Sequence, residues 1–337
     1  MQILTYKEIE REEWRRLVAA SATGTWFQTP EAYEFFAEQP ELFQPFVFGL
    51  ENERELRGVC VGYVTVEKSA VKQFLTRRAI IVGGPALADD CSEEEVAALM
   101  SAVREQLKSE AIYVECRNFN DYSRWKSAFA AAGFDYVPHL NFHVDTSSVE
   151  VVEANLGKSR KRDIKTSFRD GAIVIERPTI EQVREYYVIL ENLYRTKVKT
   201  PLFPLSFFEA LYNNPAGRFL LVGLPKNNGG VEIIGGTVCV EYAGKCAYEW
   251  FVSGRDGEWK SIFPSSVATY AGIKYAAGHN MPRFDMMGAG KPDEAYGVRD
   301  FKAKFGGTEV SHGRSLSITK PLLYKIGVLG VKILKRR

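Results

Sequence analysis

The chain has 337 residues, of which 45% are hydrophobic and 26% are charged, a balance typical of globular proteins and not of disordered ones. This length predicts about two domains, since a domain usually holds roughly 100 to 200 residues. The five cysteines are widely spaced and form no Cys-x-x-Cys pair, which argues against a zinc ribbon or a disulfide framework. The charged N-terminus and the lack of an apolar run of about 18 residues predict a cytoplasmic protein.

The two halves of the chain carry opposite charge. Residues 1–150 hold 15 Lys and Arg against 24 Asp and Glu, while the remaining residues hold 29 against 18. A basic second half is typical of a surface that meets an anion, such as a phosphate-bearing substrate, RNA or a lipid headgroup. Attraction between the two halves is the alternative explanation of the same asymmetry.

The predicted elements follow the same order twice along the chain. In the first half, strands are expected at 45–50, 58–67 and 77–84, followed by a helix at 93–109 and a strand at 111–117. In the second half, strands at 218–224, 235–243 and 246–254 precede a helix at 263–278 and a strand at 283–288. This repeat predicts two α/β (α+β) modules, each a mixed twisted sheet flanked by helices.

Other helices are predicted between and after the repeats. Residues 158–169 are rich in Lys and Arg and are expected to form a basic helix, followed by helices over 180–197 and 205–213. In the tail, 320–337, four apolar side chains recur at helical spacing among basic residues: Leu322, Ile326, Leu329 and Ile333. That pattern is typical of a helix that lies on an anionic membrane surface, although Gly327 and Gly330 weaken it.

A short motif near the end of the chain has a counterpart in the first half. Residues 299–307, RDFKAKFGG, align with SRWKSAFAAAGF at 123–134, which places Lys302 on Lys126 and Phe305 on Phe129. Aromatic residues four apart lie on one helical face, and Gly306 or Gly307 can adopt the left-handed conformation that ends a helix. The motif is therefore predicted to be a helix, its cap and a following strand.

The FDMMGAG strand end, the Phe-Lys-x-x-Phe-Gly helix and the FQTPEAY segment together resemble the FemABX family, whose members add amino acids to peptidoglycan precursors. The resemblance implies tandem GNAT-type acyltransferase modules over 1–147 and 148–315, with the tail 316–337 packing back on the first. It also implies transfer of an aminoacyl group from aminoacyl-tRNA to an amine of a lipid- or UDP-linked cell-envelope precursor, without a bound cofactor. We therefore expect a cytoplasmic protein, with peripheral contact to the inner membrane face through 320–337.

Acyl transfer from an ester to an amine passes through an oxyanion, which a fixed positive charge stabilises. By resemblance, Phe301 and Lys302 occupy the family's Phe-Lys site, and Lys302 is the candidate oxyanion stabiliser. Asp285 ends an apolar strand and is a candidate to orient the amine or accept its proton. An exposed helical lysine and a turn-capping carboxylate are the structural alternatives for these two residues.

The remaining candidates bind substrate. Tyr248 and Trp250 are predicted to share one strand face, where core packing is the alternative, and Arg195, Lys197 and Lys304 are candidate substrate contacts. The basic helix offers five candidate contacts for tRNA or a pyrophosphate: Lys158, Arg160, Lys161, Arg162 and Lys165. In the family a lysine can follow the FQTPEAY-like segment, whereas this chain has Glu34 and Glu38, so a precursor diphosphate would be held differently or be absent.

Two rival functions are a coenzyme-A-dependent N-acyltransferase, using acetyl- or acyl-coenzyme A, and a binding protein that lost catalysis. Coenzyme A binding needs a glycine-rich turn that presents N–H groups at a helix start. The first candidate turn carries five acids, and the second, SGRDGEWKSIFP, has an incomplete glycine pattern. No metal site is expected, because His139 and His143 lie about 13 Å apart if PHLNFHVD is a strand.

Overall fold

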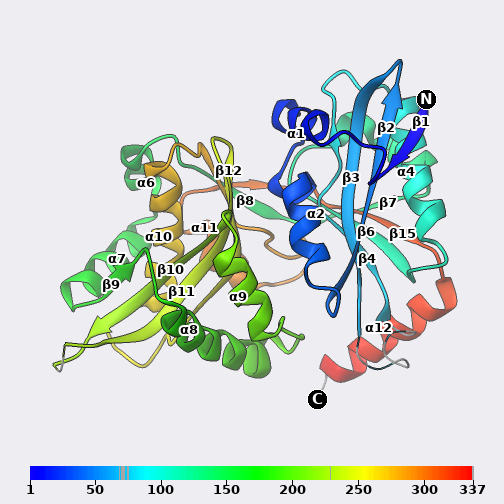
Figure 1. Ribbon diagram of the computed structural model, residues 1–337. Coiled ribbons are helices and arrows are strands. Elements are labelled where there is room, and N and C mark those ends of the chain that lie inside the picture. Colours follow the sequence, from blue (N-terminus) through cyan, green and yellow to red (C-terminus); the bar gives the residue numbers. More distant parts are fainter. Residues whose placement is uncertain (68, 70–72, 74–75, 228, 336–337) are drawn as a thin grey trace. The chain divides into compact units, whose positions relative to one another are not determined.

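The structure is a computed structural model that describes residues 1–67, 69, 73, 76–227 and 229–335, with only the backbone described for 330–335. Its helices and strands form two compact units, each built around one sheet (Figure 1). The first unit contains Met1–His139 and Ser311–Arg337, and the second contains Leu140–Val310.

The sheet of the first unit has the strand order β1-β2-β3-β4-β6-β15-β7, with β5 paired to β3. Its strands are β1 Gln2–Thr5, β2 Phe43–Asn52, β3 Glu55–Thr65, β4 Ala79–Gly83, β5 Ala86–Leu87, β6 Tyr113–Asn118, β7 Asp135–Val137 and β15 Arg314–Ile318. Its helices are α1 Arg11–Ala20, η1 Trp26–Gln28, α2 Pro30–Ala37, α4 Glu93–Leu107, η2 Ser123–Trp125, α5 Lys126–Ala131 and α12 Pro321–Lys335. All pairs are antiparallel except β4 with β6.

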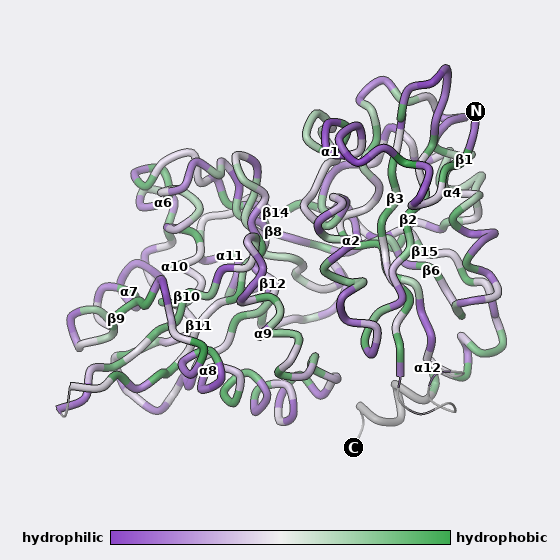
Figure 2. Tube along the Cα trace, viewed as in Figure 1, coloured by the Kyte–Doolittle hydropathy of each residue, from purple (hydrophilic) through white to green (hydrophobic). Residues whose placement is uncertain are grey.

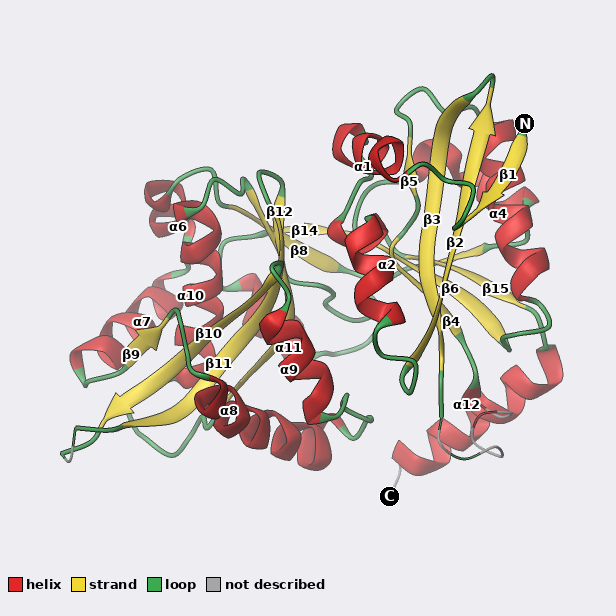
Figure 3. Cartoon of the chain, viewed as in Figure 1, coloured by secondary structure: helices red, strands yellow, loops and turns green. Residues whose placement is uncertain are grey.

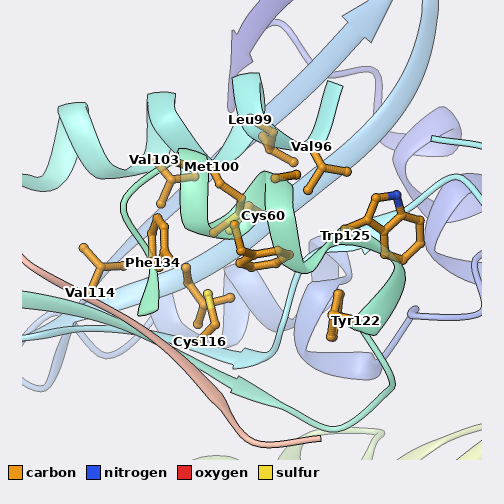
Figure 4. Packing of buried hydrophobic residues seen from close by; sticks show 14 of the residues in the cluster. Cys60, Val96, Leu99, Met100, Val103, Val114, Cys116, Tyr122, Trp125 and Phe134 are labelled. Carbon is orange, nitrogen blue, oxygen red and sulfur yellow. The ribbon is translucent and has the colours of Figure 1, made fainter. Parts of the chain in front are cut away.

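The core of the first unit lies between α4 and the sheet. Val96, Leu99 and Val103 recur at helical spacing on α4 and are fully buried against Cys60, Cys116 and their neighbours (Figure 4). A capping box starts the helix, because the Ser92 hydroxyl accepts from the Glu95 N–H and the Glu95 carboxylate accepts from the Ser92 N–H. All five cysteines of the chain are buried thiols.

The sheet of the second unit has the order β14-β8-β13-β12-β11-β10-β9. Its strands are β8 Asn141–Asp145, β9 Ile173–Ile175, β10 Gly217–Pro225, β11 Val231–Tyr242, β12 Cys246–Gly254, β13 Arg283–Asp285 and β14 Thr308–Val310. Its helices are α6 Val149–Asn155, α7 Lys158–Arg169, α8 Ile180–Leu193, the π-helical turn η3 Tyr194–Val198, α9 Leu205–Asn213, α10 Pro264–Gly278 and α11 Gly297–Ala303.

Two layers of helices enclose the second sheet (Figure 3). Helix α10 packs across β11 and β12 and is buried on nearly every side, as its small and apolar sequence requires. Helices α8 and α9 pack together and contact β11 and β10 respectively. Apolar residues run along β11, which is coloured green over much of its length in Figure 2.

The unit boundaries lie a few residues from those expected from the sequence. Strand β8, which falls inside the expected range 1–147, pairs with β13 and β14 of the second sheet. Strand β15 begins at Arg314 and pairs with β6 and β7, so the return to the first sheet starts before residue 316. Both boundaries depend on backbone hydrogen bonds between strands that are distant in sequence. The local sequence pattern does not show which strands pair in this way.

Candidate active site

Strands β12 and β13 of the second unit run parallel for only a short distance. Their register pairs Cys246 with Arg283 and ends at Tyr248 with Asp285, whereas β12 continues to Gly254. Beyond Asp285 the backbone turns away, because Met287, Gly288 and Gly290 all have positive φ. The two strands therefore separate just beyond Asp285, and the side chains of the candidate site lie around this point.

Lys302 of α11 is bound to the turn that follows β13. Its ammonium donates to the Met286 carbonyl oxygen and, at 2.8 Å, to the Gly288 carbonyl oxygen. The side chain is 7% exposed, and burial lowers the pKa of Lys302 while the carboxylates of Glu249 and Asp285 oppose that change. The lysine is thus a buried cation at the end of β13 and not an exposed helical residue.

Asp285 is fully buried, and its two carboxylate oxygens face different neighbours. Its Oδ1 accepts from Asn141 Nδ2 and from the Met287 N–H, each at 2.7 Å, and its Oδ2 lies 3.1 Å from His143 Nε2. Burial alone would raise the pKa of Asp285, but the hydrogen bonds and charge of His143 and Asn141 lower it. A carboxylate with a lowered pKa is a weak proton acceptor. The contacts of Asp285 therefore favour a role in positioning its neighbours, and its carboxylate caps the turn that follows β13.

Asn141 and His143 enter the site from β8, which pairs antiparallel with β13 so that His143 faces Asp285. The Asn141 Oδ1 accepts from the Gly288 N–H at 2.7 Å and thereby fixes the same turn that Lys302 contacts. Sequence reasoning considered His143 only as a metal ligand with His139 and missed this role. The only local sign of this role is the alternating pattern of NFHVD, which predicts a strand. That pattern does not show which other strand pairs with it.

Phe301 of α11 and Phe305, two residues beyond the end of that helix, lie side by side with ring centroids 5.2 Å apart. The guanidinium of Arg160 stacks on both rings, 4.5 and 4.7 Å from their centroids, and donates to Ser266 Oγ. Arg160 differs from the other four basic candidates on α7 because its side chain is buried and held within the second unit, an arrangement that leaves it little access to tRNA or a phosphate. Phe301, a partly buried residue of α11, packs against the hydrophobic core of the second unit.

Glu249 is a second buried carboxyl group near the site. Its Oε1 accepts from Thr237 Oγ1 at 3.3 Å, whereas its Oε2 has no hydrogen-bond partner among the described residues. Burial raises the pKa of Glu249, and the Lys302 ammonium acts in the opposite direction. Glu249 and Lys302 therefore stabilise each other's charged forms within the second unit.

The two aromatic candidates on β12 do not share a face in the simple way that alternation predicts. Val238 pairs with Phe251 and Cys239 with Glu249, so Trp250 is the extra residue of a β-bulge. Trp250 packs edge-on against Phe207 at 5.3 Å, and Tyr248 is fully buried. Both rings belong to the packing around β12, which is the structural alternative stated above.

Arg195 and Lys197 lie on the exposed π-helical turn η3, where a continuous helix over 180–197 was expected. Arg195 lines a cavity of about 620 Å³ together with Tyr187, Glu191 and Tyr194, and it donates to Asn192 Oδ1 at 3.1 Å. Lys304 is exposed at the end of α11, and its carbonyl oxygen accepts from the Gly157 N–H. The predicted left-handed cap follows at Gly306, with φ of 79°.

The basic helix α7 presents one cationic side to solvent. Four of its predicted phosphate contacts are exposed: Lys158, Lys161, Arg162 and Lys165. Lys161 and Lys165 line a cavity of about 390 Å³ with Phe168 and Tyr270. The cations and the half-exposed Phe168 ring thus lie on the same surface of the second unit, which we call the α7 surface.

The sequence of the second unit and the fold of the chain are both similar to those of known proteins. Residues 157–302 match the family model described as an acetyltransferase (GNAT) domain, which places the diverging strands, Glu249, Asp285 and Lys302 inside that domain. The second unit therefore carries a GNAT-type acyltransferase domain, and the predicted acyltransferase class is confirmed at that level. No curated protein sequence matches the chain.

Solved structures match along the whole chain. FemX has a TM-score of 0.73 and 15% identity, covering 97% of this chain and 99% of its own. The C-terminal domain of a putative lysylphosphatidylglycerol synthetase from Agrobacterium fabrum has a TM-score of 0.58 and 12% identity, covering 96% and 95%. A tandem GNAT protein from the clavulanic acid biosynthesis pathway has a TM-score of 0.58 and 10% identity, covering 94% and 98%. The predicted FemX-like tandem GNAT fold is thereby confirmed.

Proposed function

We propose that the second unit transfers an aminoacyl group from aminoacyl-tRNA to an amine of a lipid- or UDP-linked cell-envelope precursor. The observation that carries the proposal is the buried ammonium of Lys302 at the end of β13. An ammonium has three N–H groups, of which two donate to the carbonyl oxygens of Met286 and Gly288. The third is available to the oxyanion that forms when the amine attacks the ester carbon.

Asp285, His143 and Asn141 have a positioning role in this proposal. Together they hold the 286–288 turn whose carbonyl groups orient Lys302. Glu249 helps to keep the lysine charged, because a counter-charge opposes the effect of burial on the lysine pKa. No covalent enzyme intermediate is required, since the attacking amine displaces the tRNA hydroxyl directly.

The starts of the two long helices favour tRNA over coenzyme A as the donor. In the second unit, Pro264 has no N–H, the Ser265 N–H donates to Asp256 Oδ1, and the Ser266 N–H donates to Phe263. A pyrophosphate would have to displace the Asp256 carboxylate to reach this helix start. In the first unit the α4 start is capped by Ser92 and carries Glu93, Glu94 and Glu95, which repel phosphate.

The α7 surface is the proposed contact for tRNA. Its exposed cations suit a phosphate backbone, and the half-exposed Phe168 ring beside them can stack on an unpaired base. Arg195, Lys197 and Lys304 remain proposed substrate contacts, since all three are exposed on the same unit.

We propose that the protein works in the cytoplasm with peripheral contact to the inner membrane face through 320–337. None of the helices in the described part of the chain is long and apolar enough to cross a bilayer. Helix α12 nevertheless leaves Leu322, Ile326 and Leu329 exposed at helical spacing, with Leu322 78% exposed. An apolar stripe beside lysines is suited to the surface of an anionic membrane.

The proposal is tested by incubating the protein with envelope precursors and either charged tRNA or acyl-coenzyme A, and measuring the added mass. We expect an aminoacyl increment with charged tRNA and no increment with the thioester. An acyl increment from the thioester alone would instead establish the coenzyme-A-dependent alternative. No increment with either donor across amine precursors would contradict transferase activity.

A further inference from the structure

The first unit contains a cavity that the proposed reaction does not use. It has a volume of about 320 Å³ and lies beside α5, β7 and the start of β15. Phe129 and Phe134 form its apolar side and are almost fully buried, and Tyr122 and Phe134 join it to the core in Figure 4. Everything that lines it belongs to the first unit.

One wall of the cavity is a fixed aromatic ring. Tyr136 donates to the Ser311 carbonyl oxygen at 2.9 Å, and its ring covers Gly313. A Cβ atom on Gly313 would lie 2.3 Å from that ring, and Gly313 has φ of 68°, so only glycine suits this position. The ring thus presents a rigid surface to the cavity.

The cavity carries separated charges of both signs. Asp121 and Asp135 contribute carboxylates, and Lys126 contributes an ammonium that lies 5.7 Å from the Tyr136 ring centroid. The main-chain N–H of Ser123 donates to Asp121 Oδ1, and this bond lowers the pKa of Asp121. Among the described residues none of these three groups forms an ion pair, whereas charges elsewhere do, such as Lys108 with Glu105 and Arg218 with Glu241.

Asn118 supplies a buried acceptor that is not satisfied. Its Nδ2 donates to the His312 carbonyl oxygen and to Ser315 Oγ, which fixes the orientation of the amide. Its Oδ1 has no hydrogen-bond partner among the described residues, although the side chain lines the cavity and the residue is only 7% exposed. Native proteins rarely leave such an acceptor unpaired, so this buried amide marks the inner edge of the cavity as a polar one.

We propose that this cavity binds a zwitterionic amino acid with an apolar side chain. The ligand's ammonium group pairs with the acids, its carboxylate pairs with Lys126, and its side chain packs on Phe129 and Tyr136. The volume suits a molecule of this size, and a lining with one lysine and two aspartates favours a ligand that carries both charges over a purely anionic one. The inference concerns binding by the first unit and does not depend on the proposed transfer reaction.

The test is calorimetric titration of the full chain with L-phenylalanine, N-acetyl-L-phenylalanine, which lacks the cation, and L-phenylalanine amide, which lacks the carboxylate. We expect L-phenylalanine to bind up to about fivefold more tightly than either analogue, the effect of one lost pair between exposed charges. Lys126→Met should weaken L-phenylalanine by a similar factor and remove its advantage over the amide. Lys108→Met, an exposed lysine of α4's end, is the matched control and should change nothing.

A blocking variant tests the location. Ala130 is exposed on α5 and lines the cavity, whereas its neighbour Ala131 is exposed but does not line it. Ala130→Trp should abolish binding of L-phenylalanine, whereas Ala131→Trp should bind it as the parent does. If Ala130→Trp fails to fold, the result for Lys126→Met decides whether the ligand occupies this cavity. The proposal is overturned if L-phenylalanine does not bind, if either analogue binds equally well, or if a folded Ala130→Trp binds normally.

Discussion

Helices α5 and α11 occupy matching positions in the two halves of the sequence, yet they present their lysines differently. At each helix one aromatic residue lies four positions before another, Trp125 before Phe129 and Phe301 before Phe305, and the second of each pair is buried in the core of its own unit. Lys126 is exposed beside a tyrosine ring, whereas Lys302 is buried on the carbonyl oxygens of a turn. The repeat therefore preserves how the helix packs but not what its lysine contacts.

The difference arises from the strand that precedes each helix. In the second unit β13 ends in a turn with positive φ angles, and this turn directs two carbonyl groups at Lys302. In the first unit β6 leads into Asn118 and a short η2 turn, and the Trp125 ring nitrogen donates to the Cys91 carbonyl oxygen. A buried ammonium requires such acceptors, because burying an unpaired charge costs several kcal/mol.

The largest expected effect comes from Lys302→Ala. Loss of the cation that faces the oxyanion should lower turnover about 10²- to 10³-fold. Lys126→Ala should lower it far less, and Lys274→Ala on the exposed side of α10 serves as the control with unchanged turnover. Steady-state transfer assays on the three variants measure this, with thermal melting to confirm folding. Equal losses in Lys302→Ala and Lys126→Ala would remove Lys302 from the mechanism.

Asp285→Asn should reduce stability and change its pH dependence. Removing the charge that accepts from Asn141, His143 and Met287 should cost about 1.5 to 3 kcal/mol at neutral pH. The folded pKa of Asp285 lies below the unfolded value of about 3.9, so its contribution is present above that value and lost as pH falls through the folded pKa. Urea unfolding from pH 6 to pH 2 should therefore show the variant and the parent converging in acid, and parallel curves would contradict this.

Arg160 and Lys161 are neighbours on α7 that should separate packing from nucleic-acid contact. Arg160→Met removes stacking on Phe301 and Phe305 and should destabilise the protein by about 2 kcal/mol, without changing the salt dependence of tRNA binding. Lys161→Ala should leave stability unchanged and reduce the slope of log affinity against log salt by about 0.9. Filter binding across a salt series measures the salt dependence of both variants, and urea unfolding measures their stability. An unchanged slope in Lys161→Ala would exclude a phosphate contact at that residue.

The smallest expected effect involves α12. Vesicles that contain anionic lipid should bind the full chain and release a version truncated before Lys320, while Leu322→Asp should bind more weakly than the parent. Neutral vesicles provide the control, and flotation measures the bound fraction. Equal binding by the truncated and full chains would reject membrane contact through this helix.

Much of the fold could be predicted because local pattern and internal repetition agree. The helix at 263–278, the strands on each side of it and the cap at Gly306 all follow from periodicity and from glycine's freedom at positive φ. The outward face of α7 was also predictable, but not that Arg160 turns inward. That choice depends on Phe301, Phe305 and Ser266, which lie more than 100 residues away.

The site itself was predictable only in part. Lys302 is a candidate by resemblance and Asp285 by its place at the end of an apolar strand, whereas His143 and Asn141 require the knowledge that β8 pairs with β13. The bulge at Trp250 likewise escaped the alternation argument, since a single extra residue reverses every side chain beyond it. Pairing between distant strands therefore decides which polar groups meet, and no single segment contains that information.

The most direct test of the role of Lys302 is the single-turnover rate of aminoacyl transfer at saturating donor and acceptor. The rate is compared between the parent and Lys302→Ala, and the affinities for both substrates are measured separately. If Lys302 acts on the oxyanion, the rate at saturation falls about 10²- to 10³-fold while both Kd values stay the same. An unchanged saturating rate, with Kd weakened instead, would contradict that role and leave Lys302 as a residue that only binds substrate or supports the turn.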